Sequence, residues 1–197
     1  MEEPRTSTPF PEVAGHPALD LVDTVHWRLD PSRAIDTLTD FADVIAWCRQ
    51  LGLAPSAVTD AALLTATPAA TATREHRAVV ALREAVYEAV FERSERAAEL
   101  VAREHAAALS RSALRRREEP ATWEWDVPHD ATGPRAAIAM IAHDLLTADL
   151  ASARQCADDA CGWVYLDRSP RRNRIWCTAA GCGNRNRVKR HQAKRTS

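Results

Sequence analysis

Two stretches near the C-terminus repeat one cysteine spacing: Cys156-Ala-Asp-Asp-Ala-Cys161 and Cys177-Thr-Ala-Ala-Gly-Cys182. Four residues separate the members of each pair, and all four cysteines lie within the last 42 of 197 residues. Such paired spacings are typical of tetrahedral metal sites, because each short loop places two thiolates on one ion. The stretch therefore predicts a small module held together by four thiolates.

The cellular compartment decides between a metal and disulfides. Residues 1–12 contain three acidic residues, three prolines and no apolar run of the kind found in export signals. We therefore expect reduced thiols and a cytoplasmic location. Four protein ligands leave no open coordination position, so the predicted Zn²⁺ is structural. Two disulfides, or four unrelated buried thiols, are the alternatives. The fifth cysteine, Cys48, lies in an apolar helical pattern and is expected in the core.

The residues around these cysteines resemble a known family. Trp176-Cys177, four residues, and then Cys-Gly-Asn-Arg at 182–185 resemble the CGNR-type zinc finger, and the likeness covers roughly residues 153–195. In that family the finger follows a helical ABATE domain, and the pair is described as a stress-induced transcriptional regulator. Leu19–Thr24 and Leu145–Cys156 resemble the two ends of that domain. The resemblance implies an ABATE-like domain over residues 1–152 and a finger with a basic helix over residues 153–197.

Charge is distributed unevenly along the chain. The segment from Cys156 onward has ten Lys and Arg against three Asp, a net of +7, whereas the first 155 residues carry a net of −8. Four thiolates and one Zn²⁺ add −2, which leaves about +5 on the segment. A basic module of this kind favours a polyanionic partner, and we expect DNA. A solvated basic tail without a partner is the alternative.

The hydrophobic pattern predicts a mainly α fold. Helices are expected over residues 19–27, 37–51, 55–65, 73–110 with a break near Ser94, and 135–154. Trp123, Trp125 and Val127 alternate as one arm of a β-hairpin, with the two tryptophans capping the helical core or, alternatively, forming a stacking platform. In the finger, residues 163–166 and 175–176 are expected to pair around a loop over 167–174, and a helix follows from residue 184. This arrangement is treble-clef-like.

Basic residues fall on two elements of that finger, and guanidinium groups suit contacts with phosphate or guanine. The predicted nucleic-acid-binding residues are Arg168, Arg171, Arg172 and Arg174 on the loop, and Arg185, Arg187, Lys189, Arg190, Lys194 and Arg195 on the helix. Asn184 and Arg185 have an alternative role beside the metal, in which Asn184 caps the helix and Arg185 bonds to carbonyl groups or to Asp167.

A second cluster, His16, Asp20, Asp23 and His26, is the candidate pocket for a small ligand. Carboxylates and imidazoles serve acid–base chemistry, but such residues more often cap helices and satisfy their own hydrogen bonds. Phosphate-binding Gly-rich loops, the Gly-x-Ser-x-Gly elbow and the His-Glu-x-x-His motif are all absent from the sequence, so we do not expect an enzyme.

The resulting hypothesis is a DNA-binding regulator whose helical domain senses an unidentified effector. An adaptor that uses the zinc module to bind RNA or protein is one alternative, and RNA would be favoured if Trp163, Tyr165 and Trp176 were exposed. A small-molecule-binding helical protein with a structural zinc module is the other. No stretch approaches the ~20 apolar residues of a membrane span, so we expect no membrane partner. A homodimer is left open.

Overall fold

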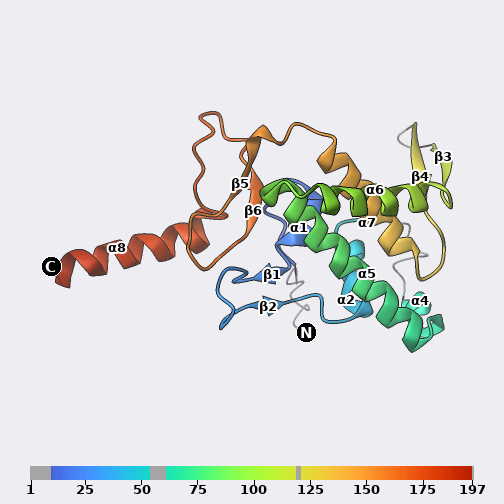
Figure 1. The fold of residues 1–197 in the computed structure, drawn as a ribbon, viewed down its shortest axis with the longest axis horizontal. Helices are drawn as coiled ribbons and strands as arrows, with labels where there is room; N and C mark the ends of the chain where they lie inside the picture. The colour runs from blue at the N-terminus through green and yellow to red at the C-terminus, as the bar shows by residue number, and fades with distance from the viewer. Residues whose placement is uncertain (1–9, 54–60, 119–120, 197) are drawn as a thin grey trace, which may run out of the picture.

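The computed structural model describes residues 10–53, 61–118 and 121–196. Helices form most of the molecule, and a small metal-binding module lies at the end from which the C-terminal helix projects (Figure 1). This mainly α architecture confirms the predicted fold class. The expected helix over residues 55–65 begins outside the described residues, and its described part lies in α4 (Ala61–Ala66).

The long helical pattern breaks where the sequence predicts. It comprises α5 (Ala69–Tyr87), a π-helical turn (Glu88–Glu92) and α6 (Glu95–Leu109). Arg93 adopts a left-handed conformation with φ of 57°. Ser94 then begins α6, because its hydroxyl accepts a hydrogen bond from a backbone N–H of the first turn. The break lets α6 pack against α7 (Gly133–Leu146) instead of continuing into solvent.

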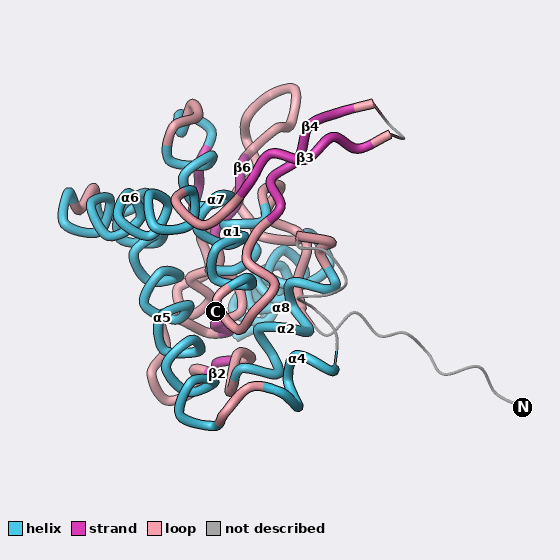
Figure 2. Tube along the Cα trace, turned by 90° about the vertical axis from the view of Figure 1, so that its right-hand side faces the viewer, coloured by secondary structure: helices cyan, strands magenta, loops and turns pink. Residues whose placement is uncertain are grey.

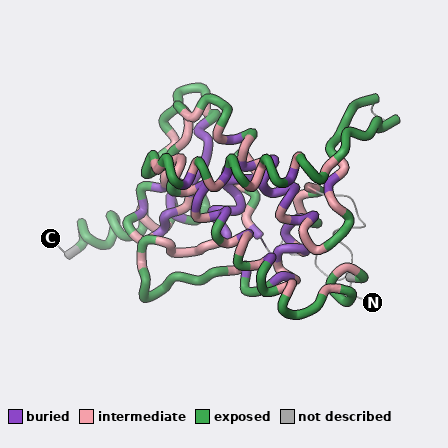
Figure 3. Tube along the Cα trace, turned by 45° about the vertical axis from the view of Figure 1, so that its right-hand side comes forward, coloured by how far each residue is buried: buried purple, intermediate pink, exposed green. Residues whose placement is uncertain are grey.

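Two further helices, α1 (Pro17–Val22) and α2 (Phe41–Gln50), complete the helical core. The predicted helix over 19–27 ends early, because Val25–His26 form a short strand, β1, that pairs with β2 (Ile35–Asp36). Cys48 is fully buried as expected, and burial raises the pKa of its thiol to about 12. Buried segments run through the middle of the molecule in Figure 3. Fully buried side chains include Trp47, Leu19, Leu82 and Ile138.

Helix α7 is shorter than predicted, since it ends at Leu146 and not near residue 154. Asp149 accepts a hydrogen bond from the Ala151 N–H at 2.8 Å and starts a 3₁₀ turn (Leu150–Ser152). The chain then extends as β5 (Ala153–Gln155), which pairs antiparallel with β6 (Val164–Leu166). The finger hairpin is therefore β5–β6, and the predicted pairing of residues 163–166 with 175–176 is wrong.

A second hairpin, β3 (Ala113–Arg117) and β4 (Thr122–Asp126), projects from the helical body in Figures 2 and 3. Trp123 is 67% exposed and Trp125 is 43% exposed, so the prediction that they cap the core is wrong. Only Val127, the next residue in the alternation, reaches the core. Across the projecting hairpin Trp123 pairs with Arg116 and Trp125 with Leu114, so the two indoles lie beside β3 and not against the core.

The finger is joined to the helical bundle by backbone hydrogen bonds. The Leu166 N–H donates to the Ala14 carbonyl at 2.8 Å, and the Arg28 N–H donates to the Cys161 carbonyl at 3.0 Å. The Asp23 carboxylate accepts from the Val164 N–H at 2.8 Å. These contacts cross the predicted boundary between residues 152 and 153. Among the described residues, no helix has both the length and the apolar character needed to cross a membrane.

Candidate metal centre and nucleic-acid interface

The four predicted ligands converge. The Sγ atoms of Cys156, Cys161, Cys177 and Cys182 all lie within 4.8 Å of one another, and all four residues are buried. Sγ–Sγ distances are 3.8 Å between Cys161 and Cys177 and 3.4 Å between Cys177 and Cys182. A tetrahedral Zn²⁺ with bonds of about 2.3 Å requires sulfur atoms about 3.8 Å apart. A disulfide requires about 2.05 Å, so the cysteines fit zinc and are not bridged.

Each cysteine binds Zn²⁺ as a thiolate, so metal binding releases the thiol protons and one cation balances part of the negative charge. The donor set is therefore suited to a soft, closed metal site.

Local backbone geometry places the first pair of ligands. The Cys156 N–H donates to the Trp163 carbonyl at 2.7 Å, which closes the loop between the two strands of the finger hairpin. Gly162, directly after Cys161, has φ of 70°, a conformation that glycine adopts without the penalty a Cβ would bring. The chain can then turn sharply from the ligand into β6.

The second pair lies at the start of the C-terminal helix. Cys182 belongs to a π-helical turn (Ala179–Gly183) that continues into α8 (Asn184–Thr196). The turn begins at Thr178, whose hydroxyl accepts from the Gly181 N–H at 2.9 Å. The cap is therefore Thr178 and not Asn184, the residue considered from the sequence. The first ligand pair thus lies in the loop of the β5–β6 hairpin and α8 follows the last ligand, an arrangement that is treble-clef-like but uses a different hairpin from the predicted one.

Arg185 lies against the metal site and not in open solvent. Its guanidinium donates to the Cys182 Sγ at 2.8 Å and to the Asp158 carboxylate at 3.0 Å. Asn186 also donates to Asp158, at 2.5 Å. Burial opposes ionisation of Asp158, but the bonds from Asn186 and Arg185 prevail and lower its pKa. The carboxylate partner of Arg185 is thus Asp158. The alternative prediction, that Arg185 bonds to Asp167, is wrong.

Arg174 on the finger loop also has a structural position. Its guanidinium donates to the carbonyl groups of Val13, Trp176 and Cys177 and stacks on the Tyr165 ring at 3.9 Å. The other three loop arginines, Arg168, Arg171 and Arg172, are exposed. The structure therefore leaves three of the four predicted loop arginines available to a partner.

Helix α8 presents the remaining predicted residues to solvent. Arg187, Lys189, Arg190, Lys194 and Arg195 are all exposed, and none of them belongs to an ion pair among the described residues. A shallow depression on one face of the helix is lined by Arg187, Arg190, His191 and Lys194. Figure 1 shows α8 leaving the body at the zinc module. The helix is thus a projecting cationic rod fixed at one end.

Comparison with known protein families agrees with this architecture. Residues 153–195 match the CGNR zinc finger, and residues 15–149 match ABATE, described as "putative stress-induced transcription regulator". The chain belongs to the ABATE family. Its four clustered cysteines are the ligands of a structural Zn²⁺. Comparison with curated proteins gives no match.

The candidate ligand cluster of the ABATE domain divides in the structure. His16 caps α1 by accepting from the Ala18 N–H, and Asp20 accepts from the Ala14 N–H at 2.9 Å. Asp23 bonds to the finger, as described above. Burial raises the pKa of Asp20 to about 6 and that of Asp23 well above its usual range. Each of these three side chains thus accepts a backbone hydrogen bond of the fold.

The fourth residue of that cluster, His26, has a different position. It lines a cavity of about 160 Å³ between the ABATE domain and the finger. The other three members do not line this cavity. The walls include two indole rings and three of the four zinc-binding cysteines: the lining residues are His26, Trp27, Cys161, Trp163, Cys177, Gly181, Cys182 and Arg185.

Sequence reasoning missed the residues that connect the finger to the ABATE domain. The Trp27 indole contacts the guanidinium of Arg185 at 4.3 Å and that of Arg33 at 3.6 Å from its centroid. Asp158 lies inside the first cysteine loop, and this position was the one available signal that it belongs to the metal site. Trp27 carried no such signal, because about 150 residues separate it from Arg185, and Arg33 reaches this region only through its stack on Trp27.

Proposed function

We propose that this protein is a DNA-binding transcriptional regulator whose finger contacts duplex DNA through α8, and that it has no catalytic activity of its own. One observation carries the proposal. Helix α8 contains six Lys and Arg and no acidic residue, it starts at the zinc centre, and it projects from the body. The family description as a transcription regulator supports the same function.

The charge pattern of α8 explains why a polyanion is the expected partner. Like charges three and four positions apart on a helix repel one another, and among the described residues Arg185 alone of the six α8 cations is paired with a carboxylate. Phosphate groups would relieve this repulsion and release condensed counterions. An α-helix fits into the major groove of B-DNA, which is about 12 Å wide. The metal site and the Arg185–Asp158 pair would fix the angle at which the helix enters.

The test is a selection from random duplex DNA with zinc-loaded full-length protein, followed by affinity measurements on the enriched sequence. We expect a motif that wild type enriches and that Arg187→Glu/Arg190→Glu does not bind. The matched control is Arg96→Glu/Arg103→Glu, which changes net charge equally at two exposed positions on α6. Equal binding by the α8 variant and wild type would contradict the proposal. A palindromic motif would indicate that two protomers bind together.

The same affinity measurements, made with single-stranded RNA, test RNA as the alternative partner. Tyr165 is fully buried, and the Trp163 ring packs edge-on against His26 at 5.1 Å. These two aromatic residues are therefore poorly placed to stack on bases, which favours DNA over RNA. Tighter binding of the single strand than of the duplex would reverse that preference.

Effector sensing is the second half of the proposal, and the cavity beside His26 supports it. A ligand there would contact both the ABATE domain and the finger. Three zinc ligands line this cavity of about 160 Å³, so the ion takes part of its volume, and the indoles of Trp27 and Trp163 line the remainder. We expect a single-ring aromatic effector to change the affinity for DNA. Titration with phenol, benzoate and indole, with the DNA dissociation constant as readout, tests this; no change with any of them would count against this site.

A further inference from the structure

We infer that the loop between β1 and β2, residues 27–34, forms a second flank of the nucleic-acid interface, and that Arg33 binds a backbone phosphate beside α8. This inference rests on the proposed function. It extends the interface from the finger to the ABATE domain, to which no nucleic-acid contact has been assigned above.

The β1–β2 loop is seated directly on the zinc module. The Arg28 N–H donates to the Cys161 carbonyl, and a Cβ placed on Gly162 would lie 2.7 Å from the Arg28 Cβ. On the other side, the Arg28 guanidinium donates to Glu84 on α5 at 2.5 Å and to the Val22 carbonyl at 3.1 Å. The loop is thus fixed both to a metal ligand and to the helical core. Its position relative to α8 is defined before any partner binds.

Trp27 holds Arg33 in place. The indole contacts Arg33 at 3.6 Å and Arg185 at 4.3 Å, and Arg185 in turn is bonded to Cys182 and Asp158. A guanidinium stacked on an aromatic ring loses less conformational entropy when it binds phosphate than a freely rotating side chain does. Arg33 is therefore preorganised for an anion.

The charge of Arg33 is not neutralised within the described part of the protein. The side chain is exposed and belongs to none of the ion pairs found there. The nearby acid in the same loop, Asp30, instead accepts from the Ser32 N–H at 3.2 Å and the Ser32 hydroxyl at 2.6 Å. By contrast, Arg83 and Arg135 of the helical core are both paired with carboxylates.

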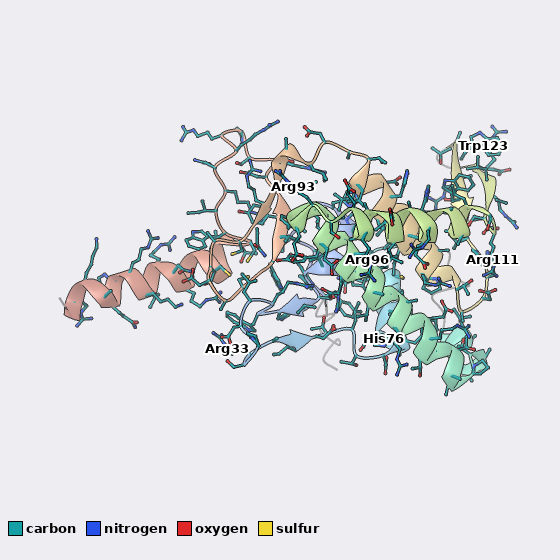
Figure 4. The ribbon with its side chains drawn as sticks, viewed as in Figure 1. Arg33, His76, Arg93, Arg96, Arg111 and Trp123 are labelled. Atoms are coloured by element: carbon teal, nitrogen blue, oxygen red, sulfur yellow. The ribbon has the colours of Figure 1, made fainter. Side chains whose placement is uncertain are left out.

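The arrangement of the three basic elements suits a duplex. In Figure 1 the finger loop lies above the start of α8 and the β1–β2 loop lies below it, and Figure 4 places Arg33 on that lower side. A helix in the major groove has one phosphate backbone on each side. The exposed arginines of the finger loop would meet one backbone, and Arg33 would meet the other.

The experiment measures the affinity of Arg33→Gln for duplex DNA over a series of salt concentrations, with Arg96→Gln as the control. We expect Arg33→Gln to weaken binding by a similar factor for all sequences and to lower the slope of log K against log salt by about 0.9, the value for one phosphate contact. Arg33→Lys should restore the slope, because it keeps the charge, but should bind more weakly than wild type, because it lacks the planar stack. The zinc content of each variant is measured as a control and shows whether the finger is still folded.

The two proposals fail in distinguishable ways. If Arg187→Glu/Arg190→Glu abolishes duplex binding while Arg33→Gln has the slope of wild type, the inference about Arg33 is wrong and the proposed function stands. If wild-type protein shows no salt-dependent binding to duplex DNA, both are overturned. A reduced slope in the Arg96→Gln control equal to that in Arg33→Gln would also overturn the inference, since the loss would then reflect net charge and not position.

Discussion

Arg185 donates a hydrogen bond to the Sγ of Cys182 at 2.8 Å, so a positive charge lies on one of the four zinc-binding thiolates. Four thiolates and Zn²⁺ carry a net charge of −2, and a neighbouring cation offsets part of it. The same guanidinium contacts Asp158 and the Trp27 ring. One side chain thus connects the metal, the first cysteine loop and the ABATE domain.

Replacing Arg185 by Ala should therefore weaken zinc binding. Loss of a residue that orients a metal ligand typically costs 10- to 100-fold in metal affinity, and we expect a change in that range. Competition with a chromophoric chelator measures it. Arg187→Ala, two positions along the same helix and exposed, is the control and should bind zinc as wild type does. Equal affinities for the two variants would mean that the Arg185 contact does not tune the site.

Cys177→Ser should lose the metal and unfold the finger, because a structural zinc site contributes folding free energy directly. We expect faster proteolysis after residue 156 and little change in the helical signal of the ABATE domain. Mass spectrometry of limited-digestion fragments locates the cleavage. A finger that stays resistant to protease in this variant would show that zinc is dispensable for its fold.

Gly162→Ala tests the contact between the finger and the β1–β2 loop. The new Cβ would meet both a positive φ and the Cβ of Arg28 at 2.7 Å. Gly52→Ala is matched, since Gly52 has φ of 60° but no atom within 4 Å of a new Cβ. Backbone strain is common to both variants, so we expect Gly162→Ala to lower the free energy of unfolding by roughly 2 kcal/mol more, the cost of overpacking. Denaturant unfolding measures the difference, and equal losses would indicate that the loop moves aside freely.

The β3–β4 hairpin should contribute little to stability through its tryptophans. Trp123→Ala removes a side chain that is 67% exposed, and we expect a change within about 0.5 kcal/mol. Trp47→Ala removes a fully buried indole and should cost roughly 3–5 kcal/mol. Thermal or denaturant unfolding compares the two. A large loss from Trp123→Ala would mean that the exposed ring is covered in solution.

Asp20 should make stability depend on pH between about 4 and 6. Its folded-state pKa is raised to about 6 by burial, so in this range the folded protein holds a proton that the unfolded chain releases. The free energy of unfolding should therefore fall as the pH rises through this window, by on the order of 2 kcal/mol. Asp20→Asn keeps an acceptor for the Ala14 N–H and removes the titration. The difference in the free energy of unfolding between wild type and variant, measured from pH 4 to pH 7, isolates the effect of Asp20. A difference that does not change with pH would contradict the prediction.

The sequence predicted the parts of the finger that local chemistry determines. Four cysteines in repeated spacing identified the metal site, and the break at Ser94 followed from a side chain that caps the helix beginning directly after it. The strand partners were not predictable in this way. Val164 and Leu166 fit a strand beside either residues 153–155 or 175–176. The choice depends on two bonds that only the folded loop makes, from the Cys156 N–H to the Trp163 carbonyl and from the Asp167 N–H to the Ser152 carbonyl.

The exposure of Trp123 could not be predicted for a different reason. Alternation shows that Trp123, Trp125 and Val127 share one face of a strand, but it does not show where the core ends. In the structure the edge of the core falls between Trp125 and Val127. The position of Arg33 could not be predicted either. Arg33 stacks on Trp27, and only the three-dimensional arrangement brings Trp27 to the zinc module.

The bonds from Leu166 to Ala14 and from Arg174 to Val13 join the finger to one of the first described segments of the chain. During synthesis Val13 and Ala14 emerge about 150 residues before their partners in the finger. A nascent chain interrupted before residue 177 has neither a complete ligand set nor the cationic helix. The zinc module therefore cannot close before Cys182 has been translated, so the basic surface forms only on chains that already contain the helical segment preceding it.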